Sequence, residues 1–193
     1  MTGLVKGEPT TGTRPRAVIQ ASSFPPMLSA AIQTKEQHRM PNIRPALISE
    51  ADILTELCLR AKAVWGYDKA FMEECRAELA LSPEKITGSL VQVAEVDGRI
   101  VGVAQVSLKG DDLAELESLF VDPEIQRSGI GRALFDWAIA ACIDHSVKAI
   151  LIESDPGAAP FYRRMGAKDV GHVPSGSIPG RVIPQLIFDL SEI

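Results

Sequence analysis

The sequence of 193 residues has few of the side chains that build metal and redox sites. It contains three cysteines and three histidines, and Cys58, Cys75 and Cys142 stand far apart without metal or redox spacing. Each cysteine lies among apolar residues at helical spacing, so we expect buried free thiols in a reducing compartment, the cytoplasm. No histidine has a neighbour that suggests a triad or a metal site, so no metal is expected.

Long apolar runs and a surplus of basic side chains are also missing. The longest apolar runs fall far short of the roughly 18 residues that a membrane-spanning helix needs, so no membrane association is expected. The net charge is −5, and residues 1–40 carry five basic and two acidic side chains, which leaves −8 for the rest. This charge argues against a nucleic-acid surface. It fits a cationic partner such as an amine, and it equally fits an ordinary acidic surface.

Length and composition predict one globular domain over residues 41–193. With 46% apolar residues, a chain of this size buries a substantial core without a second domain. Residues 1–40 are rich in Thr, Ser and Pro, and we interpret them as a disordered or artefactual extension, with Met40 as an alternative start. Arg14 and Arg16 leave a targeting segment as the other interpretation, although a clean amphipathic helix is missing.

Periodicity within residues 41–193 predicts an α+β fold with a central mixed, mostly antiparallel β-sheet flanked by helices. Helical spacing predicts helices over 49–65, 68–80, from 130 onward, and over 158–165, with Ser49 as the first cap. Apolar runs and alternation predict strands near 42–46 and over 90–96, 100–108, 113–121, 148–153 and 182–190. Asp97-Gly98 is the strongest hairpin signal in the chain.

One segment joins an apolar strand to a helix through two glycines. The strand covers residues 116–121, an Asp-Pro break follows, and Gln126-Arg127-Ser128-Gly129-Ile130-Gly131 begins the helix. The first N–H groups of a helix lack partners and carry partial positive charge, so glycines beside them favour an anion site. A Walker loop is excluded because Gly-Lys-Ser/Thr is missing, and a dinucleotide fingerprint is excluded because position 134 is Leu134.

The remaining pattern, Gln-x-x-Gly-x-Gly after a strand, resembles the acyl-CoA motif of the GNAT superfamily of N-acetyltransferases, in a bacterial-type branch. Residues 154–167 are similar to the family's Asn-x-x-Ala-x-x-Phe-Tyr-x-x-x-Gly-Phe block, with Phe161 and Tyr162 at its aromatic positions. Asp155 replaces the usual Asn, and Ala167 replaces the usual final aromatic residue. A carboxylate accepts hydrogen bonds but cannot donate one as an amide does. The resemblance covers roughly residues 41–193.

The resemblance implies a GNAT-type acyl-CoA N-acyltransferase fold with acetyl-CoA as acyl donor, a small-molecule or peptide amine as acceptor, and direct transfer in a ternary complex. It implies that strand backbone pairs with pantetheine where neighbouring strands splay, and that the glycine turn holds the pyrophosphate. The residues that it assigns to the donor are Leu119, Phe120, Val121, Gln126, Arg127, Ser128, Gly129, Ile130, Gly131, Arg132, Asp155, Phe161 and Tyr162.

Three side chains are candidates for proton transfer. Tyr162 occupies the family's general-acid position, where a phenol protonates the departing thiolate; packing or cofactor contact is its alternative role. Glu115 and Glu117 are candidates for the base, because period-two alternation places both on one strand face. Solvated strand carboxylates give the same pattern, and many family members lack a dedicated base.

The acceptor is expected to contact Trp65-Gly66-Tyr67-Asp68, which lies where the family usually shapes its acceptor pocket. Aromatic faces bind a cation, with Asp68 as counter-ion, or Trp65 merely packs a helix terminus. The loop over residues 174–181 either rims the same pocket or connects two strands. The alternative function is a non-catalytic acyl-CoA-binding or partner-binding protein, which Asp155 keeps open. No cysteine lies in either motif, so an acyl-cysteine route is disfavoured, and dimerisation through the final strand is left open.

Overall fold

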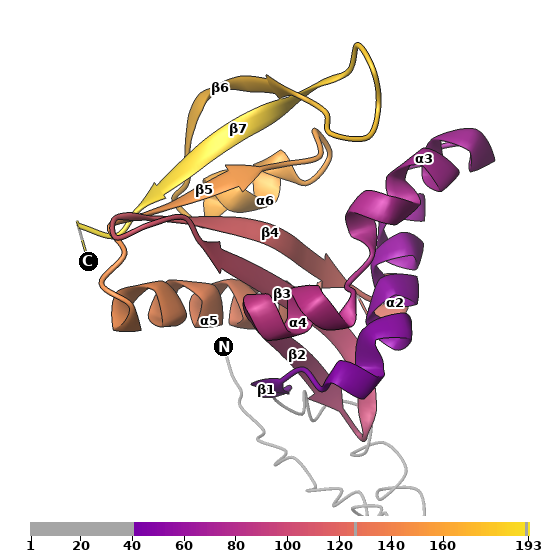
Figure 1. Cartoon of the computed structure of the whole chain (residues 1–193), viewed down its shortest axis with the longest axis horizontal. Coiled ribbons are helices and arrows are strands. Elements are labelled where there is room, and N and C mark those ends of the chain that lie inside the picture. Colours follow the sequence, from indigo (N-terminus) through magenta and orange to yellow (C-terminus); the bar gives the residue numbers. More distant parts are fainter. Residues whose placement is uncertain (1–40, 126, 192) are drawn as a thin grey trace, which may run out of the picture. The chain divides into compact units, whose positions relative to one another are not determined.

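The computed structural model describes residues 41–125, 127–191 and 193. Its seven strands form one sheet in the order β1-β2-β3-β4-β5-β7-β6, shown in Figure 1. The expectations for residues 1–40 and for Gln126 lie outside the described residues. The strands are β1 (Asn42–Pro45), β2 (Leu90–Val96), β3 (Arg99–Leu108), β4 (Leu113–Val121), β5 (Ala149–Glu153), β6 (Lys168–Pro174) and β7 (Val182–Asp189).

The predicted α+β class with a mixed, mostly antiparallel sheet is confirmed. Every neighbouring pair of strands is antiparallel except β4 and β5. The helices that flank the sheet are η1 (Ile48–Glu50), α2 (Ala51–Ala63), α3 (Lys69–Leu79), α4 (Pro83–Gly88), η2 (Pro123–Ile125), α5 (Ile130–Asp144) and α6 (Ala159–Arg164).

The β4–β5 pair is the irregular part of the sheet. These parallel strands pair over only three positions, from Leu113↔Ala149 to Glu115↔Leu151. Beyond them, β4 continues to Val121 while β5 ends at Glu153, and Figure 1 shows the two strands diverging toward the side of α2 and α3. The sheet therefore splits between its fourth and fifth strands.

Local signals explain most element boundaries. Asp97 and Gly98 both have positive φ, as the tight β2–β3 hairpin requires. Asp68 caps α3 by accepting a hydrogen bond from the Phe71 N–H at 2.9 Å. The prediction that Ser49 caps the first helix was wrong, because residues 48–50 form the separate turn η1 and α2 has no side-chain cap.

Helix α4 and strand β6 were not predicted. The short helix α4 begins after Ser82, which is its cap, and Pro83 stands at a first-turn position that tolerates proline. The edge strand β6 is exposed along almost its whole length, so it carries no apolar alternation that would reveal it.

The core lies in layers on the two faces of the sheet. Helices α5 and α6 pack with β5 and β7 around Phe135, which is fully buried. Helices α2, α3 and α4 pack with β2 and β3 around Leu54 and Leu57. Alternation along β4 sends Leu119 toward the first layer and Phe120 toward the second. The split between β4 and β5 is thus covered by different helices on each face.

Within residues 41–125, 127–191 and 193, none of the helices has the length and apolar content needed to cross a membrane. The same part of the chain contains no cluster of three or more His, Cys, Asp or Glu side chains suited to a metal ion.

Candidate active site

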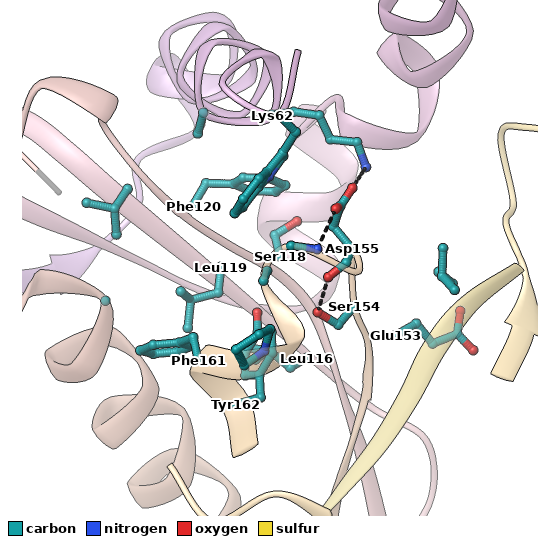
Figure 2. Close-up of a pocket in the computed structure, with 18 of the residues that line it drawn as sticks. Lys62, Leu116, Ser118, Leu119, Phe120, Glu153, Ser154, Asp155, Phe161 and Tyr162 are labelled. Atoms are coloured by element: carbon teal, nitrogen blue, oxygen red, sulfur yellow. Dashed lines mark hydrogen bonds and ion pairs between the residues drawn. The ribbon is translucent and has the colours of Figure 1, made fainter. Parts of the chain in front are cut away.

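A cleft of about 540 Å³ occupies the region where β4 and β5 separate. In Figure 2, Lys62 and Asp155 lie together at one end of it, and Phe161 and Tyr162 lie together at the other. The lining combines both helical layers, the last residues of β4 and β5, and the loop before β7. It consists of Ala61, Lys62, Trp65, Glu78, Leu79, Leu116–Val121, Arg127–Gly129, Gly131, Arg132, Glu153–Asp155, Gly157, Ala158, Pro160–Tyr162, Arg164, Ser175, Arg181 and Ile183.

One wall of the cleft is the backbone of β4. Leu119, Phe120 and Val121 pair on one edge with β3, through Ala104, Val103 and Gly102. Their other edge has no partner in β5, because that pairing stops at Glu115. Backbone N–H and C=O groups need hydrogen-bond partners. The free edge of β4 can therefore pair with an extended ligand that carries amides.

The turn before α5 forms a second wall. Arg127 and Gly129 adopt left-handed φ values of 64° and 84°, and Gly129 is the N-cap of the 15-residue helix. Successive N–H groups in such a turn form an anion-binding concavity at the positive end of the helix dipole. Ser128 supports the turn by donating a hydrogen bond to the Ile125 carbonyl at 2.7 Å. This geometry fits a diphosphate.

The other predicted members of this turn have different roles. Gly131 lines the cleft, and an added Cβ there would lie 3.6 Å from Val121 and 3.7 Å from Phe161. Arg132 also lines it and pairs with Asp136 at 3.5 Å. Ile130 is 3% exposed and packs in the core, so only its backbone is available to a ligand.

Replacing Gly129 by alanine is expected to weaken donor binding and the fold together. A residue with a Cβ pays about 1 kcal/mol for the left-handed conformation, so the free energy of unfolding should fall by that amount and the Kd for acetyl-CoA should rise. Calorimetry and urea unfolding measure both. Gly88→Ala is the matched control, because Gly88 has no positive φ and nothing within 4 Å of the added carbon. Equal effects of the two substitutions would contradict the assignment.

Tyr162 reaches the cleft from α6. It is 7% exposed and packs edge-on with Phe161, with ring centroids 5.2 Å apart, and at a tilt with Phe135, at 5.9 Å. Burial raises the pKa of Tyr162, so the phenol stays protonated at neutral pH. No hydrogen bond to its hydroxyl is formed within the described part of the chain. The side chain can therefore offer a proton to a group in the cleft.

Glu115 and Glu117 share one face of β4, as alternation indicates. Lys109 pairs with both, at 3.0 Å and 2.9 Å, but only Glu117 lines the cleft. Glu117 also falls at a register shift, because Leu116 and Ser118 face consecutive residues of β3. Burial would raise the pKa of Glu117, but hydrogen bonds and charge from Lys109 outweigh it and lower the pKa. Glu117 is therefore ionised and only weakly basic.

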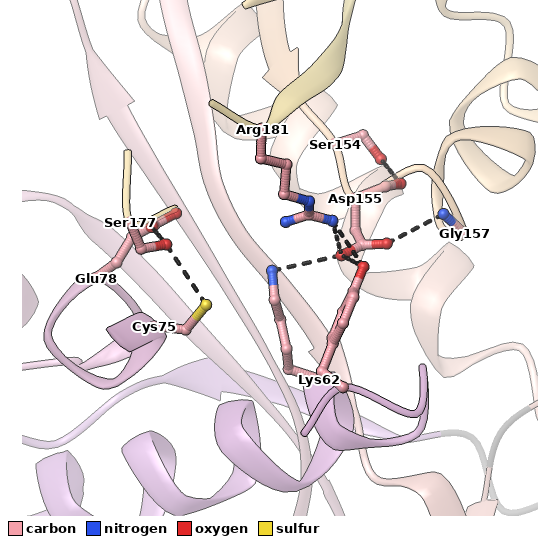
Figure 3. Close-up of polar contacts among 9 residues, drawn as sticks. Lys62, Cys75, Glu78, Ser154, Asp155, Gly157, Ser177 and Arg181 are labelled. Carbon is pink, nitrogen blue, oxygen red and sulfur yellow. Dashed lines mark hydrogen bonds and ion pairs between the residues drawn. The ribbon is translucent and has the colours of Figure 1, made fainter. Parts of the chain in front are cut away.

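Asp155 joins three parts of the chain (Figure 3). Its Oδ2 accepts hydrogen bonds from the Tyr67 hydroxyl at 2.8 Å and from Arg181 at 3.1 Å, and Lys62 lies 3.5 Å away. Its Oδ1 accepts from the Gly157 N–H at 3.1 Å. Burial would raise the pKa of Asp155, but these bonds and charges outweigh it and lower the pKa. The carboxylate is thus fully engaged by the protein.

The residues of the Trp-Gly-Tyr-Asp segment make different contacts. Trp65 lines the cleft and lies on Gly157, where an added Cβ would come within 2.5 Å of its ring. Tyr67 stacks on Phe71 at 3.9 Å, and burial together with its bond to Asp155 raises the pKa of Tyr67 to about 12. Asp68 is exposed and serves as the cap of α3.

Sequence reasoning did not single out Lys62 or assign a contact to Arg181. Both line the cleft, and their side chains are only 12% and 18% exposed. Arg181 is the last residue of the loop over 174–181, which was predicted either to rim the acceptor pocket or only to connect two strands. Because Arg181 lines the cleft, its position favours the first alternative. Lys62 gave no signal, because a lysine in the last turn of a helix is usually solvated and interacts with the helix dipole.

Comparison with known proteins gives a family and a fold. Residues 58–174 match the family model described as an acetyltransferase (GNAT) domain. Mycothiol acetyltransferase from Clavibacter michiganensis is 36% identical over 145 residues, which are 75% of this chain and 44% of that protein. N-acetylaspartate synthetase from Danio rerio is 27% identical over 123 residues, which are 62% of this chain and 44% of that protein.

The fold is shared with solved structures. The PaiA N-acetyltransferase from Thermoplasma acidophilum in complex with coenzyme A superposes with a TM-score of 0.65 at 19% identity, covering 77% of this chain and 98% of that one. The chain spans less than half the length of the two curated relatives just named. The family model nevertheless covers more than half of the chain, including the glycine turn and the block around Tyr162. The chain therefore belongs to the GNAT acetyltransferase family.

Proposed function

We propose that this protein is an N-acetyltransferase that moves an acetyl group from acetyl-CoA to a primary amine by direct transfer in a ternary complex. The observation that carries the proposal is the continuous cleft between β4 and β5, which joins the glycine turn at α5 to Tyr162. The diphosphate of acetyl-CoA would bind the turn, and its pantetheine amides would pair with the free edge of β4.

In the proposed reaction, the neutral amine attacks the thioester carbon, forming a C–N bond and an oxyanion. A backbone N–H on the free edge of β4 stabilises the oxyanion, because such donors are already oriented. The C–S bond then breaks and the thiolate takes the phenolic proton of Tyr162. The extra proton on nitrogen leaves through water, which returns a proton to Tyr162 after product release.

Of the two candidate bases, we keep Glu117 and not Glu115, because only Glu117 lines the cleft. Its lowered pKa suits it to hold an ammonium group and to pass the proton to water, more than to remove the proton alone. Direct transfer is favoured over an acyl-cysteine route, because Cys58, Cys75 and Cys142 are all buried and none lines the cleft. Buried free thiols also fit a reducing compartment such as the cytoplasm.

The proposal is tested by thiol release from acetyl-CoA with a panel of amino acids, peptides, polyamines and aminoglycosides. The names of the two curated relatives indicate different acceptors, so the panel must be broad. We expect release that depends on one class of amine and yields the N-acetyl product by mass spectrometry. Calorimetric binding of acetyl-CoA without release from any acceptor would instead favour the non-catalytic acyl-CoA-binding protein.

A further inference from the structure

We propose that the acceptor amine carries a carboxylate, as an amino acid does, and that Lys62 and Arg181 bind this carboxylate. The inference rests on the proposed function and names the substrate class of the same cleft. It starts from a charge imbalance. Lys62 and Arg181 both face Asp155, at 3.5 Å and 3.1 Å, so two cations stand against one carboxylate.

One cation is enough to neutralise Asp155, so the cluster keeps a net positive charge. Neither cation has another acidic partner within 4 Å in the described part of the chain. Tyr67 does not compensate, because its raised pKa keeps it neutral. Unpaired charge in a poorly hydrated position is costly, and an anionic ligand group would remove that cost.

Both cations also have unused hydrogen-bond donors. Arg181 directs only its Nη2 at Tyr67 and Asp155, at 2.6 Å and 3.1 Å, so Nε and Nη1 form no hydrogen bond among the described residues. The guanidinium lies 5.2 Å from the ring centroid of Tyr67 and 5.1 Å from that of Phe71. These cation–π contacts and the bonds of Nη2 hold the guanidinium in place, and a guanidinium with Nε and Nη1 available is suited to bidentate recognition of a carboxylate.

The two cations come from segments other than the glycine turn that is expected to hold the diphosphate. Lys62 lies in α2 and Arg181 is the last residue of the loop before β7, whereas the glycine turn precedes α5. Figure 2 shows Lys62 and Asp155 at the end of the pocket away from Phe161 and Tyr162. The same cleft is also lined by three acidic side chains, those of Glu78, Glu117 and Glu153. These could face the ammonium group of a zwitterion while Lys62 and Arg181 bind its carboxylate.

The arrangement also bears on the expected role of Tyr67. Its aromatic face was expected to receive a cation of the substrate, but Lys62 and Arg181 already stand 5.9 Å and 5.2 Å from the ring centroid. The ring thus already contacts two cations of the protein itself, and a purely cationic acceptor would meet repulsion there.

The test compares each amino acid or dipeptide with its C-terminal amide, which keeps the amine and neutralises the carboxylate. We expect kcat/KM for the carboxylate form to exceed that of the amide at least 10-fold, about the strength of one charge-assisted hydrogen bond. Arg181→Gln and Lys62→Met should abolish this preference while leaving KM for acetyl-CoA unchanged. Arg181→Lys keeps the charge but loses the two-point geometry, so it should keep only part of the preference. Arg163→Gln, an exposed partner of Asp169 outside the cleft, is the matched control.

Equal use of acid and amide forms, or variants that lower both equally, would overturn this inference and leave the acetyltransferase intact. If the wild-type protein shows no turnover with any acceptor, the proposed function is overturned instead. In that case, calorimetric titration of free amino acids into the acetyl-CoA-bound protein tests whether Lys62 and Arg181 bind a carboxylate. Binding that Arg181→Gln weakens would support it, and no binding would refute it. Melting temperatures of all variants separate unfolding from loss of recognition.

Discussion

Replacing Tyr162 by phenylalanine is expected to lower kcat about 100-fold, the lower end of what a positioned general acid contributes. The substitution removes one oxygen from a side chain that is packed between Phe135 and Phe161. Packing should therefore be kept, and KM for acetyl-CoA should change little. Thiol release under saturating acetyl-CoA and acceptor measures kcat, and urea unfolding checks the fold.

The chain contains one other tyrosine, which provides a matched control. Tyr67→Phe removes a hydroxyl that bonds Asp155 at 2.8 Å, so it should affect KM for the acceptor more than kcat. Because burial raises the pKa of Tyr162, the wild-type rate should not fall between pH 7 and 9 through loss of the phenolic proton. An unchanged kcat in Tyr162→Phe would assign this side chain to packing alone.

Asp155→Asn is expected to lower the free energy of unfolding at pH 7 by about 2 kcal/mol, somewhat less than for a fully buried ion pair, because its partners keep some exposure. The amide keeps the bond from the Gly157 N–H but leaves Lys62 and Arg181 without a counter-charge. The wild-type advantage follows the lowered pKa of Asp155. It is complete above the unfolded pKa of about 3.9 and disappears as pH falls through the lower folded pKa.

Urea unfolding of both proteins from pH 3 to 7 measures this difference. Asp112→Asn is the matched control, because Asp112 forms an exposed pair with Lys148 at 2.7 Å that is worth under about 1 kcal/mol. A variant as stable as wild type at pH 7 would show that Asp155 does not organise the cluster. The substitution also restores the residue usual in the acyl-CoA block, so a lower Kd for acetyl-CoA would assign position 155 to the donor.

Local sequence signals predicted the parts of the fold and the site that depend on neighbouring residues. The turn before α5 was predictable because glycine at position 129 allows the backbone conformation that the turn needs. The β2–β3 hairpin was predictable because Asp97-Gly98 is a favoured two-residue turn. The two motifs pointed to a GNAT fold, which is confirmed. Described residues from both motifs, including Gly129 and Tyr162, line one cleft, and their roles in it stay predictions. Alternation along β4 placed Glu115 and Glu117 on one face, where Lys109 contacts both.

Contacts between segments that are distant in the sequence could not be predicted from local patterns. The hydroxyl of Tyr67 and the carboxylate of Asp155 are 88 residues apart in the sequence, and no local pattern indicates that they meet. In the sequence Lys62 resembles a solvated helix lysine, and only the fold brings Asp155, 93 residues later in the sequence, within 3.5 Å of it. The edge strand β6 packs on neither face, so its sequence lacks the apolar period that reveals a strand.

The split between β4 and β5 has a kinetic consequence. Because helices of both layers line the cleft, the two substrates of the proposed reaction can enter from opposite faces of the sheet, and neither has to leave before the other arrives. Initial-rate plots should then give intersecting lines and not the parallel lines of a ping-pong scheme. A dead-end analogue of either substrate should compete with its own counterpart alone, so each half of the cleft can be inhibited separately.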